Sequence, residues 1–141
     1  MNILLAVDGS RYTKKMLAYL VTHDEMFSGN SNDFALLTVH AALPPRARAA
    51  LGKEVADTYH AEEAEKVLAP VAKFLLRHGI DAKSDWKVGH AGELIARYAD
   101  AGKYHLLMMG SHGHGALANL VMGSVATQVL AHCKVPVLLV R

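Results

Sequence analysis

Short apolar runs recur along the chain, and longer stretches with helical spacing of apolar residues separate them. Four runs, at residues 3–7, 34–40, 105–109 and 135–140, show no alternation of polar and apolar positions. Such continuous runs are typical of strands covered on both faces, as in a parallel sheet flanked by helices. A fifth run, at residues 82–88, alternates polar with apolar side chains and predicts a half-exposed edge strand.

Four helices are predicted between these runs. The first follows Ser10, a good N-cap residue, and keeps its apolar residues at a spacing of three and four as far as Val21. The second is expected at about residues 53–78, ending before Gly79 and kinked or broken at Pro70. The remaining two are expected at about residues 92–101 and 118–132.

The alternation of strands and helices indicates the fold class. The order β-α-β-α-β-α-β-α-β predicts an α/β domain with a largely parallel sheet. The one long connection, at residues 43–50, is predicted to be a mobile loop. With 141 residues and no repeat or interdomain linker, we expect one domain over residues 1–141.

Composition and charge exclude several classes of protein. A hydrophobic fraction of 52% with 20% charged residues excludes intrinsic disorder. The formal net charge of +2 gives no reason to expect nucleic acid as a partner. Cys133 stands alone, so a disulfide framework within the chain is excluded and a reducing, cytoplasmic compartment is expected. The first apolar run stops at Asp8, too early for a signal peptide, and residues 116–131 are too short and polar for a membrane span.

Glycine and small polar residues gather where two of the buried strands end. The first strand is followed by Asp8-Gly9-Ser10, and the fourth by Gly110-Ser111-His112-Gly113-His114-Gly115. Ligands of open α/β sheets bind beyond the carboxyl ends of the strands, and glycine-rich loops there direct backbone N–H groups at phosphate. The spacing matches neither the dinucleotide fingerprint nor the Walker motif, which disfavours a dehydrogenase and a P-loop enzyme. A tight turn that uses glycine for steric reasons alone remains the alternative.

Gly110, Gly113, Gly123 and Ser124 follow one another at the spacing G-2x-G-9x-G-S. This spacing resembles the nucleotide-binding signature of the universal stress protein family, G-2x-G-9x-G-(S/T). The strand that ends in Asp8-Gly9-Ser10 and the closing segment, residues 133–141, are also similar to that family. The resemblance extends in the same order over essentially all 141 residues.

The resemblance implies a Rossmann-like fold, with a five-stranded parallel sheet in the order 3-2-1-4-5 and helices on both faces. It makes the first and fourth strands neighbours, which places Asp8 beside Gly110. Members with the full motif bind ATP, so the expected ligand is ATP, or AMP or ADP, with or without Mg²⁺. The family acts in stress tolerance and signalling, usually as homodimers.

The resemblance also implies which residues contact the nucleotide. The adenine and ribose pocket would be lined by Ala6, Val7, Asp8 and Val39, with Met109 against the base and sugar. The phosphates would be held by the loop that Gly110 opens, through Ser111, His112, Gly113, Gly123, Ser124 and Val125.

The glycine-rich segment departs from many family members in its charge. Those members carry a basic residue in the nine-residue stretch, whereas residues 104–133 of this chain contain no Asp, Glu, Lys or Arg. Neutralisation of the phosphates must then come from backbone N–H groups, Ser124, a metal ion, His112, His114 or Arg11. Phosphoryl transfer normally uses a fixed cation and a metal-holding carboxylate, and Asp8 is the one obvious carboxylate. We therefore expect a binder with slow or no hydrolysis and assign no catalytic residue.

Three functional readings stay open. The preferred one is a regulatory universal stress protein of the stress response that binds an adenine nucleotide. The alternatives are a slow ATPase or self-phosphorylating protein, and a nucleotide-free dimeric interaction module. The pair His112-x-His114 is half a metal site at most, and no metal site is expected. The C-terminal strand is predicted to lie at the sheet edge and to pair with its counterpart in a homodimer, with no nucleic-acid or membrane partner.

Overall fold

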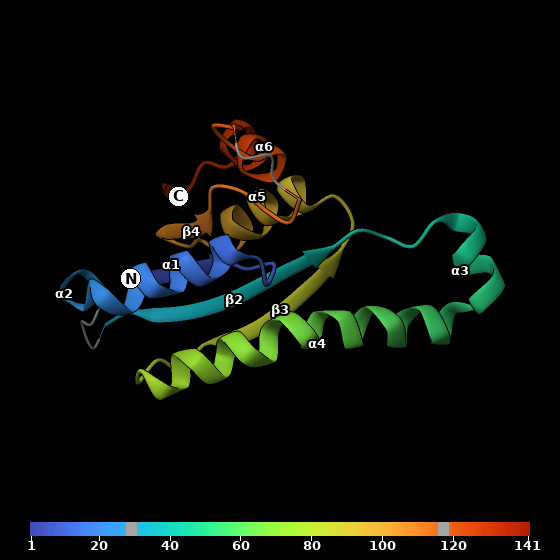
Figure 1. Ribbon diagram of the computed structural model, residues 1–141, viewed down its shortest axis with the longest axis horizontal. Coiled ribbons are helices and arrows are strands. Elements are labelled where there is room, and N and C mark those ends of the chain that lie inside the picture. Colours follow the sequence, from blue (N-terminus) through green and yellow to red (C-terminus); the bar gives the residue numbers. More distant parts are fainter. Residues whose placement is uncertain (28–30, 116–118) are drawn as a thin grey trace.

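A sheet of five parallel strands organises the described part of the computed structural model, which is residues 1–27, 31–115 and 119–141 (Figure 1). The strand order is β3-β2-β1-β4-β5, and all four neighbouring pairs are parallel. This order confirms the predicted fold. The strands are β1 (Asn2–Ala6), β2 (Asp33–His40), β3 (Lys83–Val88), β4 (Leu106–Gly110) and β5 (Val137–Val140).

Helices cover both faces of the sheet, with α4 on one side and α5 and α6 on the other (Figure 1). α1 shares the core of the α4 face. The helices are α1 (Arg11–Thr22), α2 (Asp24–Phe27), α3 (Pro45–Leu51), α4 (Lys53–Arg77), α5 (Ala91–Ala101) and α6 (Ser124–His132). None of these helices, in the ranges that the structure describes, is both long and apolar enough to cross a bilayer.

The central strand β1 shows why its sequence has no polar alternation. Ile3 and Leu5 pack into the core under α1 and α4, whereas Leu4 and Ala6 pack into the core under α5 and α6. All four side chains are buried, because helices cover both faces of this strand. The half-exposed strand predicted from alternation is β3, which lies at one edge of the sheet as expected.

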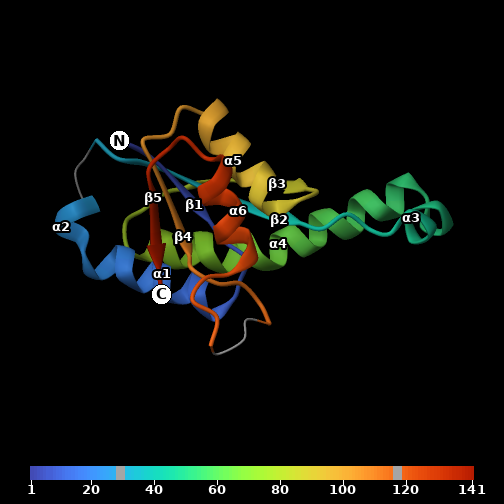
Figure 2. The same ribbon diagram turned by 90° about the horizontal axis from the view of Figure 1, so that it is seen from above.

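The prediction of a mobile loop at residues 43–50 is wrong, because Pro45–Leu51 form α3. Pro45 stands at the first helical position, where its missing N–H is of no consequence, and the arginines and alanines that follow favour a helix. No residue of α3 is buried. The helix extends away from the sheet together with the start of α4 (Figure 2), so its sequence lacks the apolar face that marks a packed helix.

Two further helix predictions need correction. The last helix starts at Ser124 and not near residue 118, which itself lies outside the described residues. The cause is Gly123, whose N–H donates to the carbonyl oxygen of Ser111 at 2.8 Å, so the chain first returns to the end of β4. α4 continues through Pro70, so the predicted break is wrong, whereas the alternative of a kink at Pro70 stays a prediction. The predicted cap of α1 is confirmed, since Ser10 Oγ accepts from the Thr13 N–H at 3.5 Å.

Candidate functional site

A cavity of about 390 Å³ opens where β1 and β4 end side by side. Ala6 of β1 is in register with Met109 of β4, and both line the cavity. This edge of the sheet is where the sequence places the site, since the ligands of such sheets bind beyond the carboxyl ends of the strands. The volume lies within the usual range for small-molecule sites.

The cavity brings together most of the residues that the family resemblance singles out. Those that line it are Ala6, Val7, Asp8, Val39, Met109, Gly110, His112, Gly113, Gly123, Ser124 and Val125. The exception is Ser111, which is 2% exposed. Its Oγ lies 2.8 Å from Nδ1 of His112, so its hydroxyl points into the loop rather than into the cavity.

Asp8 is fixed at the start of α1 by a small network. Its Oδ1 accepts a hydrogen bond from the Ser10 N–H at 2.8 Å and another from the Thr13 hydroxyl at 2.9 Å. The Thr13 oxygen in turn accepts from the Asp8 N–H at 3.1 Å. None of the hydrogen bonds within the described residues uses the other oxygen, Oδ2. A Cβ atom on Gly113 would lie 3.0 Å from Oδ2, so this oxygen borders the glycine-rich loop and can accept from a ligand.

Two glycines of the motif each allow a close approach that a Cβ atom would block. A Cβ on Gly110 would lie 2.6 Å from Cβ of Tyr12, so this glycine lets the start of α1 approach β4. A Cβ on Gly123 would lie 3.0 Å from Cα of His112, which allows the start of α6 to sit against the loop after β4. The packing alternative therefore accounts for Gly110 and Gly123, whereas Gly113 leaves space beside Asp8.

His112 holds the glycine-rich loop together through both ring nitrogens. Nε2 donates to the carbonyl oxygen of Leu120 at 2.8 Å, and Nδ1 then accepts from the Ser111 hydroxyl. His112 is 9% exposed, and the centroid of its ring lies 4.8 Å from that of Tyr12. His114 is exposed, and its Nε2 donates to the carbonyl oxygen of Asp8 at 2.8 Å. Both histidines thus act as links between loops in this structure.

Positive potential in the cavity comes from the first turn of α6. Ser124, Val125 and Ala126 line the cavity, and N–H groups in the first turn of a helix have no partner within the helix. Aligned peptide dipoles add partial positive charge at this end, which favours an anion. Arg11 does not line the cavity, because its guanidinium lies against Tyr12, with Nη2 3.2 Å from the phenol oxygen.

Several lining residues escape prediction from the sequence. They are Thr13, Ala91, Ile95, Gly115, Leu120 and Ala126, whereas His114, which also lines the cavity, was expected as a source of positive charge. Ala91 and Ile95 lie on α5, which packs so closely on α6 that a Cβ on Gly92 would be 2.5 Å from Cβ of Gln128. The position of α5 directly after β3 was a usable signal, because this connection also lies at the carboxyl edge of the sheet.

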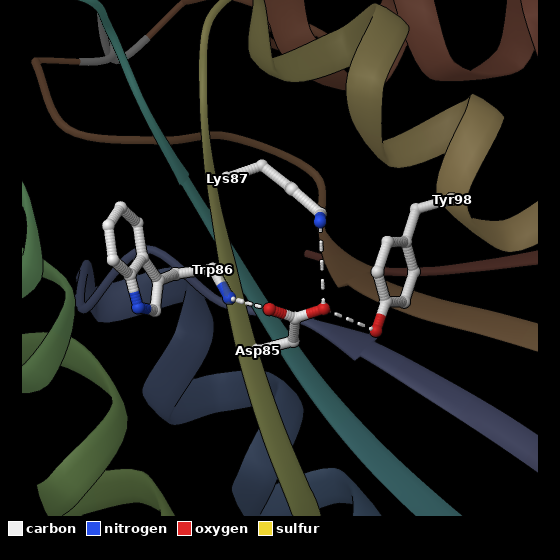
Figure 3. A network of polar contacts seen from close by, with 4 residues as sticks. All are labelled: Asp85, Trp86, Lys87 and Tyr98. Carbon is white, nitrogen blue, oxygen red and sulfur yellow. Dashed lines mark hydrogen bonds and ion pairs between the residues drawn. The ribbon is translucent and has the colours of Figure 1, made fainter.

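A second polar network lies outside the cavity and joins β3 to α5 (Figure 3). The Tyr98 hydroxyl donates to Oδ2 of Asp85 at 2.9 Å, Lys87 Nζ lies 4.0 Å from the same oxygen, and the Trp86 N–H donates to Oδ1 at 2.7 Å. Burial, followed by the Asp85 carboxylate, raises the pKa of Tyr98 well above its ordinary value. The network links the edge strand β3 to α5. In the described ranges, no three or more His, Cys, Asp or Glu side chains form a group able to hold a metal ion.

The model of the Universal stress protein family matches residues 1–141 of the chain. A universal stress protein of Thermus aquaticus is 33% identical over 142 residues, covering 99% of this chain and 98% of that protein. The chain belongs to the universal stress protein family. A second universal stress protein, from Synechocystis sp., is 32% identical over 99% of this chain, but the chain spans only 42% of that protein's length.

Solved structures of similar proteins share the universal stress protein fold. Hypothetical protein MJ0577 superposes with a TM-score of 0.81 at 25% identity, covering 99% of this chain and 94% of that one. A universal stress protein in complex with cAMP gives 0.69 at 20% identity, covering 100% and 97%. The Archaeoglobus fulgidus universal stress protein in complex with dAMP gives 0.66 at 20% identity, covering 100% and 98%. At these identities the last two comparisons establish the shared fold.

Proposed function

We propose that the cavity at the ends of β1 and β4 binds an adenine nucleotide, and that the protein is a regulatory, nucleotide-binding universal stress protein. The observation that carries the proposal is the position of the G-2x-G-9x-G-S residues. Gly110, Gly113, Gly123 and Ser124 all line one cavity, together with the first turn of α6. The relatives solved with cAMP and dAMP support an adenine nucleotide as the ligand class.

The cavity offers one region for each part of such a ligand. Apolar side chains of the sheet and of α5, among them Val39, Ile95 and Met109, suit a base. Oδ2 of Asp8 suits a ribose hydroxyl, because a carboxylate oxygen accepts the hydrogen bond that the hydroxyl donates. The N–H groups of the first turn of α6 and the Ser124 hydroxyl suit a phosphate.

The identity of the nucleotide is open to direct test. ATP, ADP and AMP are all candidates under this proposal, with Mg²⁺ as a companion of the more highly charged forms. Protein purified without added nucleotide should release an adenine nucleotide on denaturation, and chromatography of the supernatant will identify it. Incubation with radiolabelled ATP separates binding from hydrolysis. We expect no more than slow phosphate release, since no Lys or Arg lines the cavity in the described part of the chain.

We also propose that a second copy of the chain pairs with β5. This strand is at the edge of the sheet beyond β4, and its four apolar residues are only partly buried. Pro136 and Val140 direct their carbonyl oxygens at β4, where these accept from the N–H groups of Leu107 and Ser111. Because backbone groups alternate along a strand, Val137 and Leu139 direct theirs at the open edge. An apolar edge strand that is only partly buried favours pairing with another strand.

A further inference from the structure

Among the described residues, the side chains that line the proposed nucleotide site include one carboxylate and no Lys or Arg. The carboxylate is that of Asp8. The glycine-rich segment adds no Lys or Arg, since residues 104–133 contain neither, and its possible cations are histidines. A phosphate chain in this cavity therefore meets a carboxylate without a matching Lys or Arg.

Two basic side chains of α1 lie against an aromatic ring. The Arg11 guanidinium carbon and Lys15 Nζ each lie 5.1 Å from the centroid of the Tyr12 ring. A Cβ on Gly110 would meet the backbone and Cβ of Tyr12, so this part of α1 packs against β4. Neither Arg11 nor Lys15 lines the cavity. Cation–π attraction favours these positions over open solvent.

The histidines of the loop also use ring nitrogens in hydrogen bonds to other residues of the protein. Both ring nitrogens of His112 are bonded, to Ser111 Oγ and to the Leu120 carbonyl oxygen. His114 Nε2 donates to the Asp8 carbonyl oxygen. A phosphate that recruited either ring would have to break one of these hydrogen bonds.

What remains for an anion is backbone: the N–H groups of the glycine-rich loop, which are neutral dipoles, and the first turn of α6. The partial positive charge of that turn amounts to about half an elementary charge, and it falls off within the turn. One phosphate group can reach the N–H groups of this turn. Each further phosphate adds negative charge beyond the reach of the helix end, in a site where Oδ2 of Asp8 borders Gly113.

We infer that the site selects adenine nucleotides with a single phosphate group, linear or cyclic, over metal-free di- and triphosphates. This inference rests on the proposed adenine-nucleotide site and adds to it the charge of the preferred ligand. It assigns Asp8 a part in specificity, through repulsion of additional phosphates, besides its part in holding the ribose.

Calorimetric titrations of the full chain with AMP, ADP and ATP in EDTA at low salt test this inference. The expected affinity falls at each added phosphate, with AMP about tenfold or more tighter than ATP, and added salt narrows the gap by screening. Mg²⁺ should also reduce the difference in affinity between AMP and ATP, because it neutralises the phosphate chain. In Asp8→Asn the ratio of ATP to AMP affinity should rise. It should be unchanged in Asp81→Asn, an exposed acid just before β3 that lies outside the cavity.

The outcomes separate this inference from the proposed function. Metal-free ATP that binds more tightly than AMP would overturn the charge selection while leaving the site in place. A loss of ATP affinity in Arg11→Gln, with AMP unaffected, would also overturn it by revealing a cation for the outer phosphates. Failure of AMP, ADP and ATP alike to bind would refute the adenine-nucleotide site itself.

Discussion

Nε2 of His112 donates to the carbonyl oxygen of Leu120 at 2.8 Å and so closes the glycine-rich loop after β4. The bond joins two residues that line the cavity, His112 just before Gly113 and Leu120 within the stretch between Gly113 and Gly123. The same ring packs on Tyr12, at a centroid distance of 4.8 Å, which ties the loop to α1. His112 is therefore the residue through which the shape of the proposed phosphate site depends on the packing of α1.

Replacement of His112 by Phe should loosen the loop and weaken nucleotide binding. Phe keeps the aromatic contact with Tyr12 but leaves the Leu120 carbonyl oxygen without its donor, at a net cost of about 1 kcal/mol. We expect a small drop in the free energy of unfolding. We also expect the affinity for AMP to fall by about fivefold or more, which is the fold-change that about 1 kcal/mol corresponds to. Urea denaturation and calorimetry measure the two effects. His132→Phe, at an exposed site on α6, is the control, and equal behaviour of the two variants would refute this role.

Gly110 and Gly113 should respond very differently to alanine, although both belong to the same motif. The Cβ of Ala at 110 would lie 2.6 Å from Cβ of Tyr12 and 3.1 Å from its backbone carbon, which forces α1 away from β4. We expect Gly110→Ala to lower the free energy of unfolding by about 1–3 kcal/mol. At 113 the new atom meets only a side-chain oxygen, at 3.0 Å, and the loss should be small. Urea denaturation of both variants checks the order, and a reversed order would contradict the packing described for Gly110.

The sequence anticipates those features that follow from local rules. Burial on both faces leaves a continuous apolar run in β1, and the spacing of Gly110, Gly113 and Gly123 places the cavity. Features that depend on tertiary packing cannot be predicted from the sequence in this way. Ser111 falls within the motif yet turns its hydroxyl to His112, and Ile95 reaches the cavity only because α5 packs closely on α6.

The errors in the helix predictions have the same origin. α3 has no buried side chain, so the hydrophobic spacing on which such predictions depend is missing from it. The start of α6 was predicted too early because apolar residues before Gly123 continue the helical spacing. The spacing of apolar residues does not reveal that the Gly123 N–H donates to the carbonyl oxygen of Ser111.

Acid should destabilise the contact between β2 and α4 through His40. Burial, and after it the charge of His60, lowers the pKa of His40, while Glu63 opposes the shift. Nε2 of His40 and Nδ1 of His60 are buried without a partner among the described residues. The unfolded chain takes up a proton near pH 6.5, and the folded chain resists it to lower pH. The free energy of unfolding should therefore decline as the pH falls from about 7 through 6.5 toward the lowered pKa of His40.

Urea denaturation between pH 7.5 and 5.5 measures this slope. His40→Gln removes the titrating group and should flatten the curve over that interval. His78→Gln, at an exposed position after α4, is the matched control and should keep the wild-type slope. A slope that persists in His40→Gln would assign the acid sensitivity to other groups.

The proposed dimer predicts a light-scattering mass of twice that of the chain at micromolar concentration. Leu139→Pro removes an N–H that faces the open edge of β5 while sparing the carbonyl groups that bond to β4, so it should yield a monomer. Leu139→Ala shortens the same side chain but keeps the N–H, and it should remain a dimer. A monomeric intact chain, or a dimeric Leu139→Pro, would indicate that β5 is not the interface.

The most direct test of the nucleotide site is a calorimetric titration of AMP into the chain and into Gly113→Val. The branched side chain would meet Oδ2 of Asp8 and occupy the space beside the first turn of α6, without touching the buried core. Ala101→Val, at an exposed position at the end of α5, controls for the added bulk. The proposed site predicts binding to the parent chain and to the control, and loss of binding in a Gly113→Val protein that still unfolds cooperatively. Unchanged AMP affinity in folded Gly113→Val would contradict the assignment of this cavity to the nucleotide.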